Sequence, residues 1–95
     1  MASLVKQKKT AWQLERHFKG MANHYRIDIL ILIAQQPEIN LEDIANYLNA
    51  NLKTISEHTR RLVQAGLVNK KYFGRIVAHT LSPYGQRFYK FIKTF

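Results

Sequence analysis

The sequence has no cysteine, few acidic residues and no long apolar run. Without cysteine, the chain forms no disulfide, has no thiol nucleophile and cannot build a zinc site that needs a thiolate. Its longest apolar run, residues 29–34, is far shorter than the roughly 20 residues that span a bilayer. The first residues also lack the apolar core of an export signal. We therefore expect a protein that is not exported and has no membrane partner.

The scarcity of acids leaves 15 Lys and Arg against 6 Asp and Glu, a formal net charge of +9. This charge is unevenly distributed, because residues 27–51 carry a net charge of −4 and residues 52–81 carry +5. This uneven distribution indicates that the basic segment forms a side of the protein that faces a polyanion. The alternative is a basic protein that has no anionic partner.

The length of 95 residues predicts one domain. Residues 1–9 are polar and rich in Lys, so we expect a flexible basic tail that is either solvated or in contact with a polyanion. Within a single domain at 10–95, the apolar spacing predicts a helix at 10–19. The Ile-rich run that follows could by itself be a buried strand, but its length, the Asn23 cap and Pro37 just after its end favour a central core helix at 23–36.

The next two predicted helices are separated by a tight turn. Asn40 and Asn51 are residues that favour helix N-termini, and they open helices at 40–48 and 52–65. The turn at 49–51 is rich in Asn, which tolerates the left-handed backbone that such a turn needs. Two helices in this arrangement can lay the second one in a DNA major groove.

A hairpin follows the second of these helices. Gly66 is placed to end the helix, and alternating residues at 67–81 then predict the two strands of a wing, with Phe73 and Gly74 at its tip. The predicted fold class is therefore mainly α with a small antiparallel β-hairpin, a winged helix-turn-helix of about five helices and a two-stranded wing.

The helix at 52–65 and the wing carry the predicted DNA contacts. Short polar residues near the start of this helix can approach base edges, and guanidiniums one turn later can reach guanine edges or phosphates. We predict base readout by Thr54, Ser56, Glu57 and Arg60, and phosphate binding by Lys53, Arg61, Lys70, Lys71 and Arg75. The alternative is an amphipathic helix with a solvated polar face. In the wing, Tyr72 and Phe73 are either surface residues or packed ones, and we favour packing.

The last predicted helix, at 83–95, is unusually aromatic. Ser82 followed by Pro83 opens it, and its apolar residues recur at three- and four-residue steps. This is too much apolar area to leave in water, so the residues either close the core or pair with a second copy, and we favour the dimer. The predicted dimer interface consists of Trp12, Phe18, Tyr84, Phe88, Phe91, Ile92 and Phe95.

Four short segments match one known family pattern. They are Met21-Ala22-Asn23-His24-Tyr25-Arg26-Ile27-Asp28-Ile29-Leu30, Thr54-Ile55-Ser56-Glu57-His58, Ala65-Gly66-Leu67-Val68, and Gly74-Arg75 with Val77. In these segments residues 21–81 resemble the winged helix-turn-helix repressors of the ArsR type. The motifs distinguish a winged helix from other folds better than they distinguish one winged-helix family from another, since MarR-like and other relatives share the Gly-Leu-Val motif and the wing.

The resemblance implies a homodimer, joined through its terminal helices, that binds a palindromic operator and represses transcription in a prokaryotic cytoplasm. It implies DNA contacts from Thr54, Ser56, Glu57 and Arg60, and from the wing around Gly74 and Arg75. It gives His58 a place among the DNA-binding residues, with a partly structural role.

Two departures from the family pattern stand out. Thr59 occupies a position that is usually Leu, which is expected to loosen the packing beneath the helix. The metal-sensing motifs are also missing, because one needs cysteines and the other needs Asp, His and Glu on the last helix, where residues 82–95 offer Lys, Arg and aromatics. We therefore expect no bound metal and no cofactor.

Other classes of function fit less well. A winged helix can instead serve as a protein- or RNA-interaction module, or as a sequence-blind architectural DNA-binding protein. An enzyme is disfavoured, because Ser56, Glu57 and His58 are consecutive on one helix and point in different directions, so they cannot form a relay.

Overall fold

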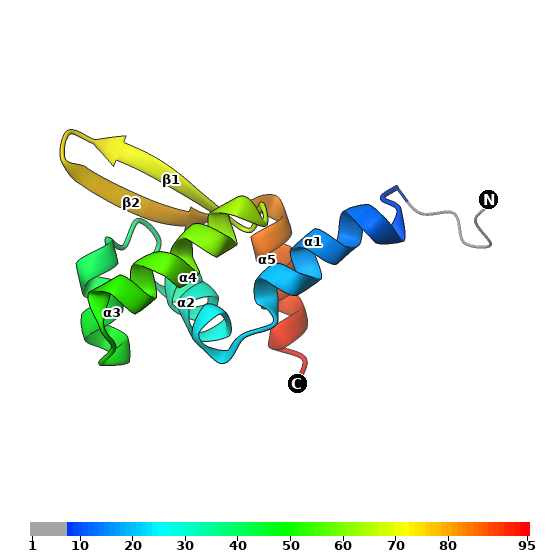
Figure 1. The fold of residues 1–95 in the computed structure, drawn as a ribbon, viewed down its shortest axis with the longest axis horizontal. Coiled ribbons are helices and arrows are strands. Elements are labelled where there is room, and N and C mark those ends of the chain that lie inside the picture. Colours follow the sequence, from blue (N-terminus) through cyan, green and yellow to red (C-terminus); the bar gives the residue numbers. More distant parts are fainter. Residues whose placement is uncertain (1–7) are drawn as a thin grey trace.

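A computed structural model describes residues 8–95, which form five helices and one two-stranded antiparallel sheet (Figure 1). The elements are α1 (Ala11–Met21), α2 (His24–Gln35), α3 (Leu41–Leu48), α4 (Leu52–Gln64), β1 (Val68–Phe73), β2 (Ile76–Leu81) and α5 (Pro83–Ile92). The predicted fold class is confirmed. The predicted basic tail lies outside the described residues, except for Lys8 and Lys9.

Side-chain caps set the starts of the helices. Asn23, Asn40, Asn51 and Ser82 each accept a hydrogen bond from a backbone N–H in the first turn of α2, α3, α4 and α5. These caps explain why the predicted starts agree with the observed ones. The ends agree less well, since α1 continues to Met21 and α5 stops at Ile92. None of the described helices combines the length and apolar composition that crossing a membrane requires.

Helix α2 is the centre of the core, as predicted. Its Ile29, Leu30 and Ile33 are fully buried, and the helix packs against α1, α3, α4, α5 and β2. The inward residues Ile55 and Leu62 of α4 are also fully buried. Helix α4, which we call the recognition helix because it is the helix predicted to enter the major groove, thus packs on the core through one face. Its polar face points outward.

The hairpin of β1 and β2 is tied to the helical body at one end only. Phe73 pairs with Ile76, so the turn is Gly74-Arg75, one residue later than predicted. Gly74 has φ +60, which suits the first position of a type II′ turn. Near the other end, His79 N–H donates to the Ile39 oxygen at 3.0 Å, which fixes β2 to the α2–α3 connection. The tip therefore extends away from the body (Figure 1).

Helices α1 and α5 pack on each other through aromatic rings. His17 stacks on Tyr84 with ring centroids 4.7 Å apart, and Phe18 meets Phe88 edge-on at 5.3 Å. His17 Nδ1 also lies 2.7 Å from the Ala65 oxygen, just after α4. The terminal helices are therefore joined to the C-terminal end of the recognition helix.

Candidate nucleic-acid interface

The outward face of α4 is polar and basic. Asn51 caps the helix by accepting from the N–H of Lys53 at 2.8 Å, which fixes its first turn. Lys53, Ser56, Arg60 and Arg61 are exposed, whereas Thr54 and Glu57 are partly buried. Six of the predicted DNA-binding residues thus lie on one accessible helix face, with hydroxyls near its N-terminal end and guanidiniums one turn later.

Glu57 holds both guanidiniums of this face. Its Oε1 accepts from Arg60 Nη2 at 2.6 Å and from Arg61 Nε at 3.2 Å. The hydrogen bond from Arg60 holds the pKa of Glu57 below its usual value, and the two positive charges add to this effect. Because all three side chains are half-exposed, the ion pairs orient the guanidiniums more than they stabilise the fold.

His58 faces inward, unlike its neighbours on α4. Its ring stacks on Tyr25 of α2 at 5.2 Å, and its Nδ1 accepts from Arg26 Nη1 at 3.1 Å. Burial lowers the pKa of His58, and the Arg26 and Arg61 cations lower it further, so the ring is neutral at pH 7. This geometry gives the structural share of its role, which is to fix α4 on α2.

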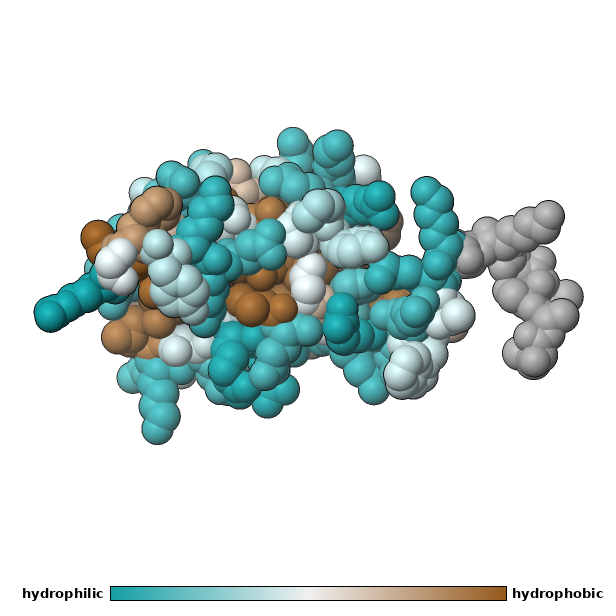
Figure 2. Space-filling view, turned by 90° about the horizontal axis from the view of Figure 1, so that it is seen from above, coloured by the Kyte–Doolittle hydropathy of each residue, from teal (hydrophilic) through white to brown (hydrophobic). Residues whose placement is uncertain are grey.

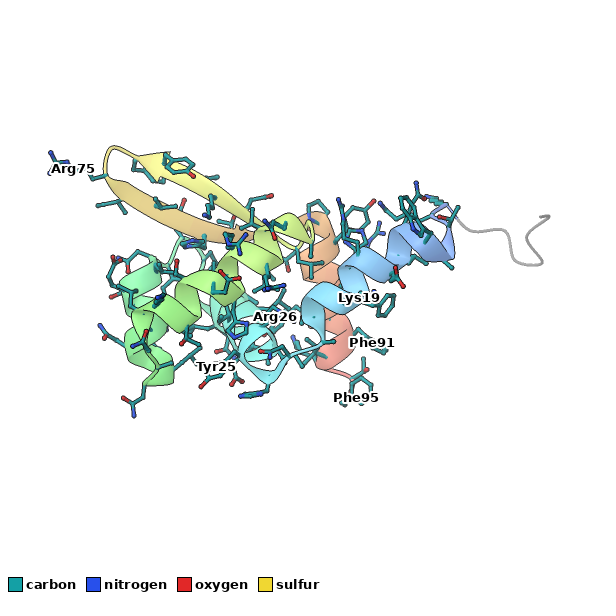
Figure 3. All side chains as sticks on the ribbon, viewed as in Figure 1. Lys19, Tyr25, Arg26, Arg75, Phe91 and Phe95 are labelled. Atoms are coloured by element: carbon teal, nitrogen blue, oxygen red, sulfur yellow. The ribbon has the colours of Figure 1, made fainter. Side chains whose placement is uncertain are left out.

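The basic residues of the wing do not share one face. Lys70 pairs across the ladder with His79, and Lys71 pairs with Ala78, so the two Lys side chains point to opposite faces. Both were predicted to bind phosphate, but the pleat separates them. Arg75 is in the turn itself, and its side chain points away from the body (Figure 3).

A hollow joins the wing to α4. Its volume is about 340 Å³, and its lining includes Ser56 and Thr59 of α4, Asn40 before α3, and Lys70 and Val77 of the wing. Arg75 and Ile76 line it as well, so the recognition helix and the β2 edge of the hairpin form a continuous surface. Of the two wing lysines, Lys70 and not Lys71 lines the hollow.

The two aromatic residues of β1 near the wing tip are exposed to solvent. Tyr72 and Phe73 were predicted to pack, but both are exposed, together with Ile76 across the hairpin. The prediction was wrong because the hairpin contacts the helices only near its base, so no described element reaches the tip to cover these rings.

A second basic surface lies beside the C-terminal half of α4, and the sequence did not predict it. Arg16 and Lys19 of α1, Arg26 of α2 and Arg61 of α4 line a cleft of about 260 Å³. Figure 3 shows Lys19 and Arg26 on neighbouring helices beside α4. No local motif signals this cluster, because its members come from three helices. It extends the positive surface from the C-terminal half of α4 onto α1.

The residues predicted for a dimer interface divide into two groups. Tyr84, Phe88 and Ile92 are partly buried and pack against the core. Trp12, Phe18, Phe91 and Phe95 are exposed, with 83% of Trp12 and 94% of Phe95 accessible. One side of α5 therefore closes the core, which is the first of the two alternatives, while α1 and α5 still expose four aromatic rings.

A groove of about 630 Å³ runs between α1 and α5. Aromatic rings of Phe18, Tyr84 and Phe88 line it, and Lys9 and Arg87 stand at its edge over the Tyr84 ring. His17 Nε2 is buried beside it without a hydrogen-bond partner among the described residues. Within residues 8–95, no group of three His, Asp or Glu side chains is arranged to hold a metal ion.

Comparisons with known proteins agree with this geometry. The family model described as "MarR family" matches residues 23–71, which include α2, α3, α4 and the first part of the wing. One similar structure is the protein Mb0332 from Mycobacterium bovis, described as a homodimeric winged helix-turn-helix DNA-binding domain and a possible ArsR-family transcriptional regulator. It is 30% identical, with 99% of this chain and 88% of that chain covered and a TM-score of 0.80.

A further similar structure is HlyU from Vibrio cholerae. It is 24% identical over 93% of this chain and 96% of that chain, with a TM-score of 0.81, and this likeness bears on the fold alone. Together with the observed hairpin and capped α4, these matches establish a winged helix-turn-helix. The chain belongs to the MarR family.

Proposed function

We propose that the protein is a homodimeric transcriptional regulator that binds a specific sequence in double-stranded DNA, and that it acts as a repressor in the cytoplasm. The observation that carries this proposal is the continuous polar and basic surface formed by α4 and the wing. Its hydroxyls, guanidiniums and ammonium groups have the chemistry that reads base edges and binds phosphates.

In this proposal α4 lies in the major groove. Thr54 and Ser56 approach base edges near the start of the helix, and Arg60 reaches a guanine edge or a phosphate one turn later. Glu57 sets the direction of Arg60 before DNA arrives, since it already binds that guanidinium at 2.6 Å. Lys53, Arg61, Lys70 and Arg75 supply the phosphate contacts.

The dimer is formed by the exposed aromatic rings of α1 and α5. The partner subunit covers Trp12, Phe91 and Phe95 and fills the groove at Phe18. Two copies related by a two-fold axis present two α4 helices, which suits a palindromic operator. The M. bovis relative, described as homodimeric, supports this arrangement.

Beyond membership of the MarR family, we propose that the chain works in the manner of ArsR-type regulators, without metal sensing. The support is the relative described as a possible ArsR-family regulator, together with the sequence motifs above. Since the chain has no cysteine, thiolate metal sensing is chemically impossible for it.

The experiment that tests the function is a salt titration of binding to a selected palindromic duplex and to a scrambled duplex, with the mass in solution measured alongside. Four phosphate-binding cations in each of two protomers predict a slope of log K against log salt of about −7. A dimer that prefers the palindrome supports the regulator. Equal affinity for both duplexes, or a monomer, would favour an architectural protein or an interaction module instead.

A pair of variants separates base readout from phosphate binding. Arg60→Ala should relax the preference at one base position by about 1–3 kcal/mol, whereas Lys70→Ala should weaken the selected and scrambled duplexes equally and make the salt slope shallower. Binding measured across a set of single-base operator variants checks both. If Arg60→Ala leaves every base preference unchanged, the docking of α4 is wrong.

A further inference from the structure

The tip of the wing exposes three large apolar side chains. Tyr72 is 70% accessible, Phe73 55% and Ile76 60%. Figure 2 shows hydrophobic residues gathered at this end of the molecule, beside a hydrophilic side chain that projects beyond them. These three residues belong neither to the proposed contact of α4 with the major groove nor to the proposed dimer interface of α1 and α5.

The ladder register places two of them together at the end of the hairpin. Phe73 is directly opposite Ile76, so their side chains lie on the same face, next to the two-residue turn. Tyr72 pairs with Val77 and lies on the other face. Gly74 and Arg75 make the turn, so the Phe73–Ile76 pair stands directly behind the projecting Arg75 guanidinium (Figure 3).

The charge around the pair indicates what covers it. Lys71 lies on the same face of β1 as Phe73, and Arg75 is in the turn. From residue 58 to residue 95 the sequence contains no Asp or Glu, so the wing is basic without exception. An apolar pair flanked by cationic side chains is complementary to a polyanion that also exposes apolar surface. The stacked bases of a duplex offer such surface beneath their phosphates.

The wing is also continuous with the DNA-binding surface of α4. The hollow lined by Ser56 and Thr59 of α4 includes Arg75, Ile76 and Val77 of the wing. A duplex seated on α4 would therefore pass the wing, whose tip exposes Phe73 and Ile76. The flanking minor groove is the part of the duplex that a wing tip beside a major-groove helix can reach.

We propose that Phe73 and Ile76 form an apolar wedge that enters the minor groove beside the α4 site, where it partly unstacks one base step and bends the duplex. Arg75 enters the groove with it and binds phosphates or base edges. This inference rests on the proposed DNA binding. It adds a specificity element, because apolar wedges in the minor groove kink DNA by roughly 20–90° toward the major groove.

The wedge predicts a sequence preference at the base step that Phe73 and Ile76 unstack, independent of the contacts that Arg75 makes. Pyrimidine–purine steps such as TA unstack more easily than other steps, so the flank should favour TA over GC. We expect a TA flank to bind about tenfold more tightly, within the range that single base-pair changes produce.

The test compares wild type with the double variant Phe73→Ser, Ile76→Ser on duplexes that carry a selected operator. Fluorescence resonance energy transfer between the duplex ends measures the bend, and 2-aminopurine at the flanking step measures unstacking. Wild type should bend the duplex and raise the 2-aminopurine signal. The double variant should still bind the operator, with the bend, the signal and the TA preference lost.

Tyr72→Ser is the matched control, because it removes an equally exposed ring from the opposite face of the same strand. It should keep the bend and the TA preference. Since all three positions are exposed, equal thermal midpoints will show that the variants fold. A straight duplex bound by wild type, or a double variant that keeps the bend, overturns the wedge while DNA binding stands.

Other outcomes point elsewhere. If wild type binds no duplex selectively, the proposed function fails together with the wedge. If the double variant instead changes the mass in solution or binding to anionic lipid vesicles, with bending unaffected, the apolar tip contacts another protein chain or a membrane surface and the wedge is overturned.

Discussion

Thr59 places a hydroxyl group in the buried face of the recognition helix α4. Its side chain is 1% accessible, and its Oγ1 has no hydrogen-bond partner among the described residues. A buried hydroxyl without a partner costs free energy, since its bond to water is lost on folding. Thr59→Val should therefore raise the free energy of unfolding by about 1 kcal/mol.

Urea unfolding measures this change, with Thr54→Val one turn earlier as the matched control. Thr54 is only partly buried, so the same substitution there should alter stability much less. A destabilised Thr59→Val protein would mean that a partner, such as an ordered water, satisfies the hydroxyl in solution.

His79 makes the fold sensitive to acid. Burial lowers its pKa and the Lys70 cation adds to this, while its bond to the Ile39 oxygen and the charge of Glu42 oppose it. A folded pKa below the unfolded value means that the unfolded chain takes up a proton first as pH falls. Its contribution is thus fully present above pH about 6.5 and is lost as pH falls from there toward the folded pKa.

The free energy of unfolding, measured between pH 8 and pH 5, should therefore decrease on the acidic side. The pKa of His58 is lowered too and adds to the same trend. His79→Gln keeps a donor for the Ile39 oxygen but cannot titrate, so the free energy of unfolding should decrease less between pH 8 and pH 5. If its pH profile runs parallel to that of wild type, His79 is not responsible for the acid sensitivity.

At the scale of elements, the junction of α4, β1 and α5 sets the direction of the wing. Ser82 Oγ donates to the Gly66 oxygen at 2.6 Å and accepts from Gly85 N–H at 3.0 Å. Gly85 lets α5 approach the backbone so closely that a Cβ there would overlap the Leu67 oxygen. The absence of a side chain at Gly85 therefore fixes α5 against the base of the hairpin.

Gly85→Ala should lower the free energy of unfolding by about 3 kcal/mol, because neither backbone can yield without moving α5 or β1. Thermal or urea unfolding checks this. Gly74→Ala is the control, because a Cβ added at Gly74 would meet no atom within 4 Å apart from its chain neighbours. Since its φ is +60, we expect the free energy of unfolding to fall by only about 1 kcal/mol. Equal effects of the two variants would contradict the close approach at Gly85.

At the scale of the molecule, the two exposed surfaces lie in different places. The wing tip and the terminal helices extend from opposite sides of the core in Figure 1, within an overall extent of 47 × 30 × 21 Å. The proposed DNA contacts belong to α4 and the wing, while the proposed dimer contacts belong to α1 and α5. One protomer can therefore meet a partner subunit without covering its recognition helix.

Removing the terminal aromatics tests this division. The double variant Phe91→Ala, Phe95→Ala should be a monomer by light scattering, and should bind a palindromic duplex about 100-fold more weakly, because the avidity of two linked sites is lost. Tyr47→Ala removes an exposed ring from α3 instead and should leave the mass unchanged. A dimer that persists in the double variant would place the interface elsewhere.

The sequence by itself determined the helices, their starts and the hairpin. Capping residues such as Asn51 and Ser82 act within one turn, and the nearly continuous apolar run of α2 already marks an element that is buried on most sides. The outward face of α4 follows from the helical period of its own apolar residues. These features depend on neighbours along the chain, so they can be predicted without knowing how the elements pack.

Only the tertiary structure decided how these elements meet. It turned His58 toward Arg26, left the Thr59 hydroxyl without a partner within residues 8–95, and brought Arg16 and Lys19 beside α4. It also held the hairpin to the body near its base alone, which exposes the apolar tip. Each of these outcomes depends on contacts between residues far apart in the chain, and the periodicity of one element carries no information about them.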